Sequence, residues 1–290
     1  MAQPLASSRI CFVGAGSIAE AILRGLIGRG MADPQRISVL NRQNAARLDY
    51  LAETYRIRTS VDPVEKEKFV READIVILAM KPKDAGESLR TIRGLLNEAQ
   101  LIVSVVAGLS TESIRQLLGF PAKIARTMPN TSSTIGEGAT GVAFTDNVEP
   151  ERRELALELF RAVGVVFPVE EQKLDIVTGV SGSGPAYVYY LMEAMIAAGV
   201  AGGLPEDVAR KLTVQTVLGA ARMVETTGKT PERLRRNVTS PNGTTQAAIE
   251  TLDRFQFREG VTRAVLRAAE RAREIGETIA AESINEGRQV

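Results

Sequence analysis

The sequence predicts an α/β protein with a doubly wound, parallel sheet in its N-terminal half and an all-helical C-terminal half. Up to about Val169, short β-rich runs alternate with amphipathic stretches, a pattern typical of a parallel sheet covered on both faces. Beyond that point, apolar residues recur at helical spacing. The chain has 290 residues. Since domains run to roughly 100–200 residues, we expect two of them, residues 1–169 and residues 170–290.

The expected strands are short and rich in Val, Ile and Leu. They cover residues 9–13, 36–40, 57–59, 74–80, 101–106, 122–126, 141–144 and, at one edge of the sheet, 165–169. Near-continuous apolar runs at residues 75–77 and 103–106 are typical of strands buried on both faces. The principal helices are expected at residues 17–28, 45–55, 184–200, 205–227 and 257–285, with shorter ones starting at Thr230-Pro231 and near Thr245.

Composition excludes several kinds of site. The chain has no histidine and a single cysteine, Cys11, which rules out His-based triads, His or thiolate metal sites and an intramolecular disulfide. No dense acidic motif suggests a carboxylate metal site, so we expect no metal. The single cysteine and the absence of a signal-peptide pattern at the start favour a cytoplasmic protein.

Charge and hydropathy give no reason to expect a nucleic acid or a membrane as partner. The formal net charge is +1, so no strong field would attract a polyanion or an anionic surface. No stretch approaches the ~18 uninterrupted apolar residues of a membrane span. The expected partners are therefore a small molecule and further copies of the chain.

A glycine-rich turn follows the first expected strand. Residues 14–19 read G-A-G-S-I-A, the G-x-G-x-x-A spacing, and they lie between a strand and a helix. The first glycine permits the tight turn, the second lets a pyrophosphate approach, and Ala19 keeps the helix close to the strand. The free N–H groups of the helix start favour an anion. This predicts a Rossmann-type dinucleotide site contacted by Gly14, Gly16, Ser17 and Ile18.

The residues after the second expected strand indicate which dinucleotide binds. An acidic residue there would accept hydrogen bonds from the ribose of NAD, but this chain has Asn41 and Arg42. Arg42 can pair with a 2′-phosphate, which favours NADPH, while NADH remains possible. The alternative is that Arg42 is a solvated surface arginine.

Two more strand ends are expected at the cofactor site, because ligands of doubly wound sheets bind at the carboxyl ends of the strands. The residues concerned are Ala79, Met80, Lys81 and Pro82 after the fourth strand, and Ala107 and Gly108 after the fifth. Small residues there let the backbone face the nicotinamide. Lys81 is equally consistent with a ligand contact and with a solvated loop charge.

Three further segments resemble signatures of the pyrroline-5-carboxylate reductase family. They read R-T-M-P-N-T at residues 126–131, S-G-S-G-P-A-Y at residues 181–187 and V-T-S-P-N-G-T-T at residues 238–245. With the glycine turn and A-M-K-P at residues 79–82, the resemblance covers nearly the whole chain. It implies NAD(P)H-dependent reduction of the cyclic imine 1-pyrroline-5-carboxylate to L-proline, the last step of proline synthesis. It also implies a Rossmann domain, a helical dimerisation domain with swapped C-terminal helices, and an active site between them.

The resemblance implies roles for residues in the helical half. Thr245 would contact the ring nitrogen as its candidate proton donor, and Ser240, Gly243 and Thr244 would hold the substrate carboxylate. A helix start such as this one suits a carboxylate, although Thr245 could equally cap the helix. The family usually has two glycines after the proline, whereas this chain has Asn242 in place of the first. Because asparagine tolerates left-handed backbone, we expect the turn to survive.

Three other features follow from the same resemblance. Asn237 matches a position near the nicotinamide, and the family has an acid near the substrate that corresponds to Glu170 or Glu171, of which we assign Glu171. The two glutamates could equally be a solvated pair. Ser132 stands where the family frequently has proline. Neither this change nor Asn242 removes a functional side chain.

The lack of histidine fits imine chemistry. A protonated imine accepts hydride directly, whereas ketone reduction usually needs a proton donor for the developing alkoxide. Two alternatives stay open. One is a β-hydroxyacid dehydrogenase, for which Lys211 is available without matching context. The other is a redox-sensing regulator that binds NADP without turnover.

The helical half also predicts self-association. Residues 186–200 are more apolar than a surface helix should be, and the last helix carries an alanine-rich apolar stripe. A monomer would expose both surfaces, which monomers seldom tolerate. We therefore expect a homodimer or a higher homo-oligomer through the C-terminal helices.

Overall fold

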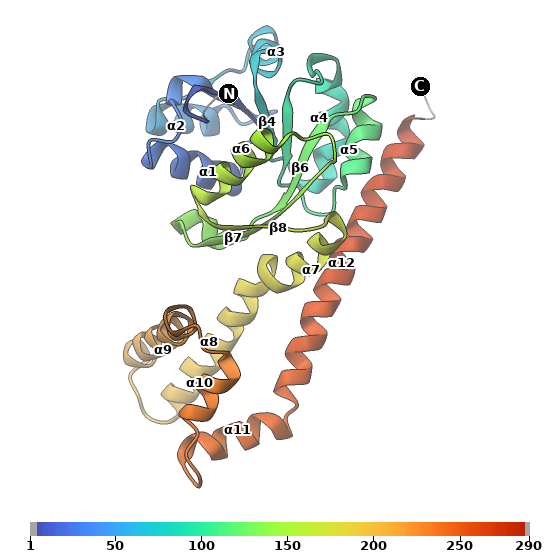
Figure 1. Ribbon diagram of the computed structural model, residues 1–290. Helices are drawn as coiled ribbons and strands as arrows, with labels where there is room; N and C mark the ends of the chain where they lie inside the picture. The colour runs from blue at the N-terminus through green and yellow to red at the C-terminus, as the bar shows by residue number, and fades with distance from the viewer. Residues whose placement is uncertain (1–4, 288–290) are drawn as a thin grey trace. The chain divides into compact units, whose positions relative to one another are not determined.

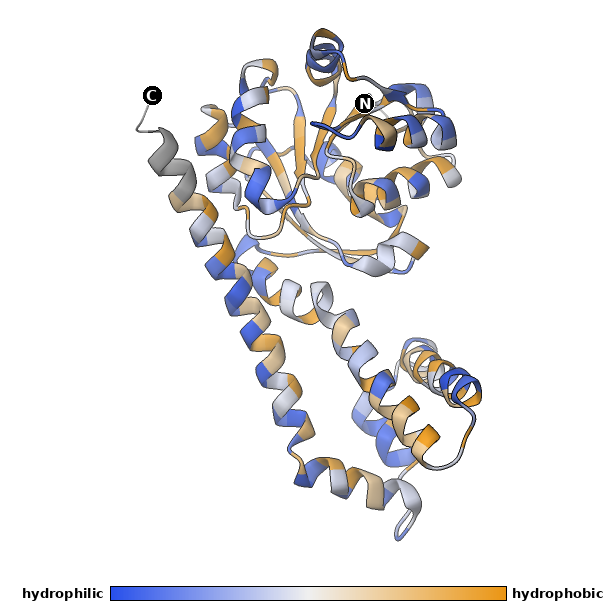
Figure 2. Cartoon of the chain, turned by 180° about the vertical axis from the view of Figure 1, so that it is seen from behind, coloured by the Kyte–Doolittle hydropathy of each residue, from blue (hydrophilic) through white to orange (hydrophobic). Residues whose placement is uncertain are grey.

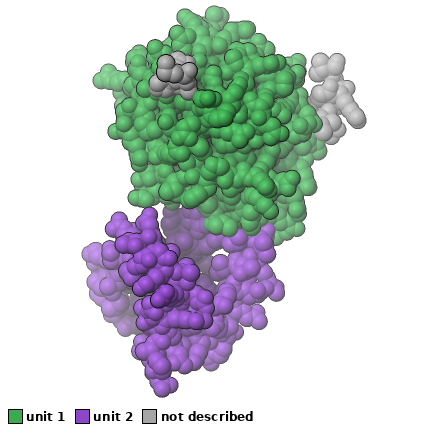
Figure 3. Space-filling model, in the orientation of Figure 1, with its two compact units in different colours: residues 1–182, 267–290 green, residues 183–266 purple. Residues whose placement is uncertain are grey.

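The chain divides into two compact units. The computed structural model describes residues 5–287, with side chains to residue 281 (Figure 1). Unit 1 comprises Met1–Gly182 and Arg267–Val290, and unit 2 comprises Ser183–Leu266, as Figure 3 shows by colour. This division groups residues by packing and returns the end of the chain to the first unit. The expected division into a cofactor-binding domain, residues 1–169, and a helical domain, residues 170–290, stays a prediction.

Unit 1 contains an eight-stranded sheet in the order β3-β2-β1-β4-β5-β6-β7-β8. The strands are Ile10–Val13 (β1), Ile37–Leu40 (β2), Arg58–Thr59 (β3), Ile75–Leu78 (β4), Leu101–Ser104 (β5), Lys123–Met128 (β6), Gly138–Phe144 (β7) and Gly164–Pro168 (β8). The doubly wound order is confirmed, since the chain moves outward from β1 first to β3 and then to β8. β8 forms one edge, as expected.

One pairing differs from the expected parallel sheet, because β7 runs antiparallel to β6 while the other neighbours are parallel. Only a short turn that contains the 3-10 helix η5 (Thr131–Ile135) links β6 to β7. A parallel crossover needs about a dozen residues or more, so this link can only bring the chain back antiparallel.

Helices cover both faces of the sheet. They are α1 (Ser17–Gly28), α2 (Ala45–Tyr55), α3 (Pro63–Glu72), α4 (Ala85–Ile92), α5 (Thr111–Leu118), α6 (Pro150–Arg161) and α7 (Leu174–Val177). Short turns of helix lie at η1 (Leu5–Ser7), η2 (Pro34–Arg36), η3 (Pro82–Asp84), η4 (Arg93–Leu95), η6 (Glu171–Lys173) and the π-helical η7 (Thr178–Gly182). One apolar core joins α1, α2 and α6 to the sheet, and a second joins α3, α4 and α5 to its other face. Alternate residues of β1 point into the two cores, as the period of a strand requires.

The last helix returns to unit 1. α12 runs from Phe257 to Gly287, and the buried Ile279 belongs to the second core. Ala272 is also buried, so one face of this part of α12 is packed rather than solvated. The alanine-rich stripe seen in the sequence thus has a partner within the chain over its final turns.

Unit 2 is helical. Its elements are α8 (Gly184–Ala201), α9 (Glu206–Thr227), α10 (Pro231–Asn237), α11 (Thr244–Arg254) and the first part of α12. Thr230 caps α10 by accepting a hydrogen bond from the Arg233 amide, as expected from the Thr-Pro pair. Asn242 has φ 58°, so the expected left-handed asparagine is confirmed.

Apolar side chains remain uncovered along unit 2 in the single chain. Figure 2 shows hydrophobic residues along its helices, and none of the residues of α8 is buried. Tyr190, Leu212 and Phe255 are 77%, 56% and 82% exposed. No helix within the described residues is long and apolar enough to cross a membrane.

Candidate functional site

The glycine turn lies at the carboxyl end of β1 and is held against β4. The Gly14 amide donates to the Leu40 carbonyl over 2.9 Å, and the Ala79 amide donates to the Val13 carbonyl over 2.9 Å. Gly14 has φ +120°, and a Cβ there would lie 2.4 Å from the Ala79 oxygen. Both the backbone conformation and the close approach therefore require glycine.

The start of α1 is open to a ligand. Gly16 is the N-cap with an extended backbone, and the nearest atom to a Cβ built on it would be 4.0 Å away. Ser17 is exposed, Ile18 is half-buried, and Ala19 is buried against the sheet. An exposed helix start with unobstructed N–H groups is the geometry that a pyrophosphate needs, so these residues fit a dinucleotide.

An arginine on α2 braces this turn. The Nε of Arg47 donates to the Ala15 carbonyl over 3.0 Å, and its guanidinium also pairs with Glu20 on α1. Glu20 accepts a further bond of 2.9 Å from the hydroxyl of Tyr55. Burial opposes ionisation of Glu20, but the hydrogen bonds from Arg47 and Tyr55 outweigh it and lower the pKa of Glu20. Burial and the bond to Glu20 raise the pKa of Tyr55 to about 12.

The sequence did not indicate that Arg47 contacts Ala15 and Glu20. Arg47 and Glu20 are far apart in the chain, and each one matches an ordinary solvated charge on a polar helix face. No spacing rule connects the two helices, so only their packing reveals that Arg47 positions the glycine turn.

The loop after β2 contains one cation, Arg42, and is contacted by a second, Lys66. Asn41 shapes the loop, because its Oδ1 accepts from the amides of Gln43 at 3.2 Å and Asn44 at 3.4 Å. Lys66 of α3 donates from Nζ to the Asn41 carbonyl over 3.2 Å. Arg42 is exposed and pairs with Glu87 of α4, Nη1 to Oε2, at 2.5 Å. The expected contact between Arg42 and a 2′-phosphate stays a prediction, and Lys66 is a second cation beside this loop that the sequence did not indicate.

The ends of β4 and β5 complete this edge. Ala79 is buried, Met80 is half-buried, and Lys81 is an exposed N-cap of η3, which begins with Pro82. After β5, Ala107 is half-buried and Gly108 has φ +77°. All the cofactor residues expected from β1, β2, β4 and β5 lie after strands that run parallel in one sheet. They therefore share one edge.

The Gly108 turn packs directly under α12. A Cβ on Gly108 would lie 2.9 Å from the Gly276 nitrogen, and a Cβ on Gly276 would lie 2.5 Å from the Gly108 oxygen. Two backbones can approach this closely only because both residues lack a side chain. The last helix consequently restrains the turn after β5.

Glu171 takes part in a network of hydrogen bonds rather than a freely solvated pair. Its carboxylate accepts from the Thr111 amide at 2.8 Å and the Thr111 hydroxyl at 2.5 Å, which ties it to the first turn of α5. It also pairs with the buried Arg126, Nη1 to Oε1, at 3.2 Å, and Arg126 reaches Asp175 at 3.5 Å. The expected contact between Glu171 and substrate stays a prediction. The structure adds that Glu171 joins β6 and α5 to the segment before α7.

Two of the sequence signatures meet in space. Asn130, after β6, donates from Nδ2 to the Ser181 hydroxyl at 3.4 Å, and its Oδ1 accepts from the Ala139 amide at 3.1 Å. The Ser181 hydroxyl donates to the Ala139 carbonyl at 3.1 Å. Ser181 lies in the π-helical turn η7, a rare geometry that is frequent at functional sites. These residues fix the turn that leads into α8.

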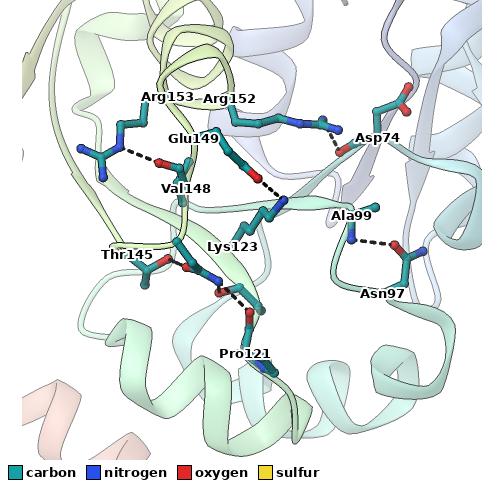
Figure 4. Close-up of polar contacts among 12 residues, drawn as sticks. Asp74, Asn97, Ala99, Pro121, Lys123, Thr145, Val148, Glu149, Arg152 and Arg153 are labelled. Carbon is teal, nitrogen blue, oxygen red and sulfur yellow. Dashed lines mark hydrogen bonds and ion pairs between the residues drawn. The ribbon is translucent and has the colours of Figure 1, made fainter. Parts of the chain in front are cut away.

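At the opposite end of the strands, near the start of β6, the polar side chains bind to one another and to the backbone (Figure 4). Lys123 pairs with Glu149 at 2.5 Å, and Arg153 donates to the Val148 carbonyl at 2.9 Å. The hydrogen bond from Lys123 is the main cause of the lowered pKa of Glu149. Since these polar groups stabilise the turns that they come from, the carboxyl edge is the better candidate for ligand binding.

The second set of candidate residues lies in unit 2, at the start of α11. The Gly243 amide donates to the Ser240 carbonyl at 3.1 Å, and a Cβ on Gly243 would lie 2.5 Å from the Ser240 hydroxyl oxygen. Gly243 is the N-cap, followed by Thr244 and Thr245 in the first turn. The Asn242 amide donates to the Gln246 side chain at 2.8 Å. The residue that caps α11 is therefore Gly243 rather than Thr245.

Asn237, by contrast, is the exposed last residue of α10. Ser240 and Thr244 are also exposed, whereas Gly243 and Thr245 are half-buried. Within the part of the chain that the structure describes, no group of three or more Cys, Asp or Glu side chains could hold a metal ion.

Two family models match the chain. The model for pyrroline-5-carboxylate reductase dimerisation matches residues 171–275, and the model for NADP oxidoreductase, coenzyme F420-dependent, matches residues 9–108. Pyrroline-5-carboxylate reductase 1 of Bacillus subtilis is 41% identical over 271 residues, which cover 93% of this chain and 90% of that relative. The chain belongs to the pyrroline-5-carboxylate reductase family. The resemblance drawn from the motifs is confirmed.

Other members of the pyrroline-5-carboxylate reductase family are similar over the same extent. The reductase of Arabidopsis thaliana is 37% identical, covering 95% of this chain and 98% of that protein. The solved structure of a pyrroline-5-carboxylate reductase from Coxiella burnetii has a TM-score of 0.86 at 39% identity, covering 93% of this chain and 98% of that chain. The crystal structure of the Plasmodium falciparum enzyme with NADP bound has a TM-score of 0.82 at 27% identity, covering 94% and 99%.

Proposed function

We propose that this chain reduces 1-pyrroline-5-carboxylate to L-proline with NADPH, and with NADH less effectively. The observation that carries the proposal is the glycine turn held on β4 beside the open start of α1, in a chain that belongs to this family.

All but one of the proposed cofactor residues belong to unit 1. We propose that the start of α1 binds the pyrophosphate, that Arg42 contacts the 2′-phosphate, and that the strand ends position the nicotinamide. The residues assigned to the cofactor are Gly14, Gly16, Ser17, Ile18, Asn41, Arg42, Ala79, Met80, Lys81, Pro82, Ala107, Gly108 and, from unit 2, Asn237. Lys66 joins them because it contacts Asn41.

The substrate residues lie mainly at the start of α11. The backbone of Gly243 and Thr244, together with Ser240, would hold the carboxylate, since amides at a helix start favour an anion. Thr245 would support the ring nitrogen and donate a proton to it, and Glu171 would lie near the substrate. A bound reduced nicotinamide would supply the hydride for the imine carbon, and the residues named above would orient the imine and support its nitrogen.

One assay tests the activity directly. Purified protein is mixed with NADPH and 1-pyrroline-5-carboxylate, and loss of NADPH absorbance is followed together with formation of proline. NADP with 3-hydroxy acids tests the dehydrogenase alternative. Lys211, the lysine available to that chemistry, is exposed and pairs with Asp207 one turn away at 3.1 Å. Cofactor binding without any turnover would instead support a regulator and refute the proposal.

Thr245 is tested by a matched set of variants. If its hydroxyl supports the nitrogen in the transition state, Thr245→Ala lowers kcat and kcat/KM together. The activation free energy should rise by about 2–4 kcal/mol, as for other preorganised donors. Thr245→Ser keeps the hydroxyl and should restore most of the rate. The control is Thr251→Ala on the same helix, where the hydroxyl donates to the Ala247 carbonyl and accepts from the Arg254 guanidinium. A wild-type rate in Thr245→Ala would remove the catalytic assignment.

We also propose that unit 2 supplies the interface of a homodimer or a larger homo-oligomer. The exposed apolar side chains of α8, α9 and α11 support this, because monomers rarely leave such a surface to solvent. A cytoplasmic location and the absence of nucleic-acid partners stay predictions from composition.

A further inference from the structure

An ion pair joins the loop after β2 to the helix after β4. The sheet order places β2 and β4 next to β1, one on each side, and both run parallel to it. Arg42 follows β2, and Glu87 lies in the first turn of α4, which follows β4. Their side chains meet at 2.5 Å. The pair therefore connects the loop after β2 to the start of α4, and these segments follow the two strands that flank β1.

Two other cations near this edge have partners of their own. The guanidinium of Arg47 is bound to Glu20 and to the Ala15 carbonyl, and Lys66 contacts the Asn41 carbonyl. The carboxylate of Glu87 thus lies against the guanidinium of Arg42. The proposed function needs that guanidinium to bind a phosphate.

The Arg42–Glu87 pair is easily exchanged. The side chain of Arg42 is 60% exposed and that of Glu87 is 65% exposed. Exposed ion pairs contribute little to stability, because water competes for both partners. Arg42 contacts Glu87 through Nη1, whereas a guanidinium can bind a phosphate through two parallel hydrogen bonds. A 2′-phosphate can therefore displace Glu87 from Arg42.

We propose that Glu87 determines cofactor specificity by competing with the 2′-phosphate for Arg42. This inference rests on the proposed function. Binding of NADPH must break the pair, whereas NADH carries no 2′-phosphate and leaves it intact. Glu87 accordingly lowers the affinity for NADPH and leaves the affinity for NADH unchanged. It thereby reduces the preference for NADPH over NADH that Arg42 creates.

The test measures binding rather than turnover. The probes are 2′,5′-ADP, which carries the 2′-phosphate without a nicotinamide, and 5′-AMP, which lacks that phosphate. Dissociation constants are measured by calorimetry for the wild type, Glu87→Gln, Arg42→Ala and the double variant. The matched control is Glu154→Gln, which removes the same charge from another exposed glutamate paired with an arginine, Arg161 on α6.

In Glu87→Gln, 2′,5′-ADP should bind about two- to fivefold more tightly, the range that an exposed ion pair allows. Binding of 5′-AMP should not change, and Glu154→Gln should match the wild type. In the Arg42→Ala background, Glu87→Gln should no longer alter binding of 2′,5′-ADP, because the competition is gone.

Three results would overturn the inference: unchanged or weaker binding of 2′,5′-ADP in Glu87→Gln, a gain that persists without Arg42, or an equal gain in Glu154→Gln. Failure of the proposed function is distinguishable, since the wild type would then not reduce the imine, whether or not it binds NADPH. A wild type that does both, with a Glu87→Gln variant that binds 2′,5′-ADP no better, refutes the role of Glu87 alone.

Discussion

Replacing Gly276 with alanine should loosen the turn that follows β5. The alanine Cβ would lie 2.5 Å from the Gly108 oxygen, well inside van der Waals contact, so α12 or the turn must shift. Alanine in place of a mid-helix glycine normally adds about 0.5–1 kcal/mol of stability. Overpacking of a close contact costs about 1–3 kcal/mol. The two terms predict a variant that is between unchanged and about 2.5 kcal/mol less stable.

The same helix provides the control. A Cβ on Gly260 would have no atom within 4 Å, so Gly260→Ala keeps the gain in helix propensity without the clash. Urea unfolding of both variants at one protein concentration should separate them by about 1–3 kcal/mol. NADPH should also bind more weakly to Gly276→Ala, because Gly108 belongs to the proposed nicotinamide site. Gly28→Ala at the end of α1, also in open space, serves as a second control outside unit 2. If Gly276→Ala is as stable as Gly260→Ala and binds NADPH equally well, the argument from close approach is wrong.

The remaining predictions concern the brace, the core and the assembly. Arg47→Ala removes the donor to the Ala15 carbonyl, so we expect a higher KM for NADPH with kcat less affected; an unchanged KM would show that the turn holds its shape alone. Because the pKa of Glu20 is lowered in the folded protein, its stabilisation is present above the ordinary value of 4.5 and is lost as pH falls through the folded pKa. The difference in stability between wild type and Glu20→Gln should therefore shrink in acid, and a constant difference would contradict this. Burial raises the pKa of Cys11 to about 12, so a thiol reagent should label the native protein only as fast as it unfolds. Light scattering should give at least a dimer at micromolar concentration, and a stable monomer would refute the interface assigned to unit 2.

Local pattern was enough to predict most elements of this fold. α1 and α2 begin and end where the sequence predicts, because the glycine turn, the polar cap at Asn44 and the apolar period all act within a few residues. The left-handed conformation of Asn242 was predicted for the same reason. The predicted direction of β7 was wrong, since strand direction depends on the length and path of the link from β6.

The candidate site divides along the same line. The glycine turn and the basic residue after β2 are short motifs whose chemistry is contained in the residues themselves. The contacts of Arg47 with Ala15, of Glu171 with Thr111, and of Gly276 with Gly108 were not predictable, because each one joins segments that only packing brings together.

The sequence by itself determined the fold class, the dinucleotide motif, the family and the exclusion of histidine chemistry. Each of these depends on residue identity and on spacing within one element or turn. Only the tertiary structure decided which charged side chains form ion pairs. Arg42 is proposed to bind a phosphate because of its position after β2, and Glu87 reaches it because β2 and β4 lie on either side of β1. Strand order sets that neighbourhood, and it follows from how the whole chain buries its apolar surface rather than from any local pattern.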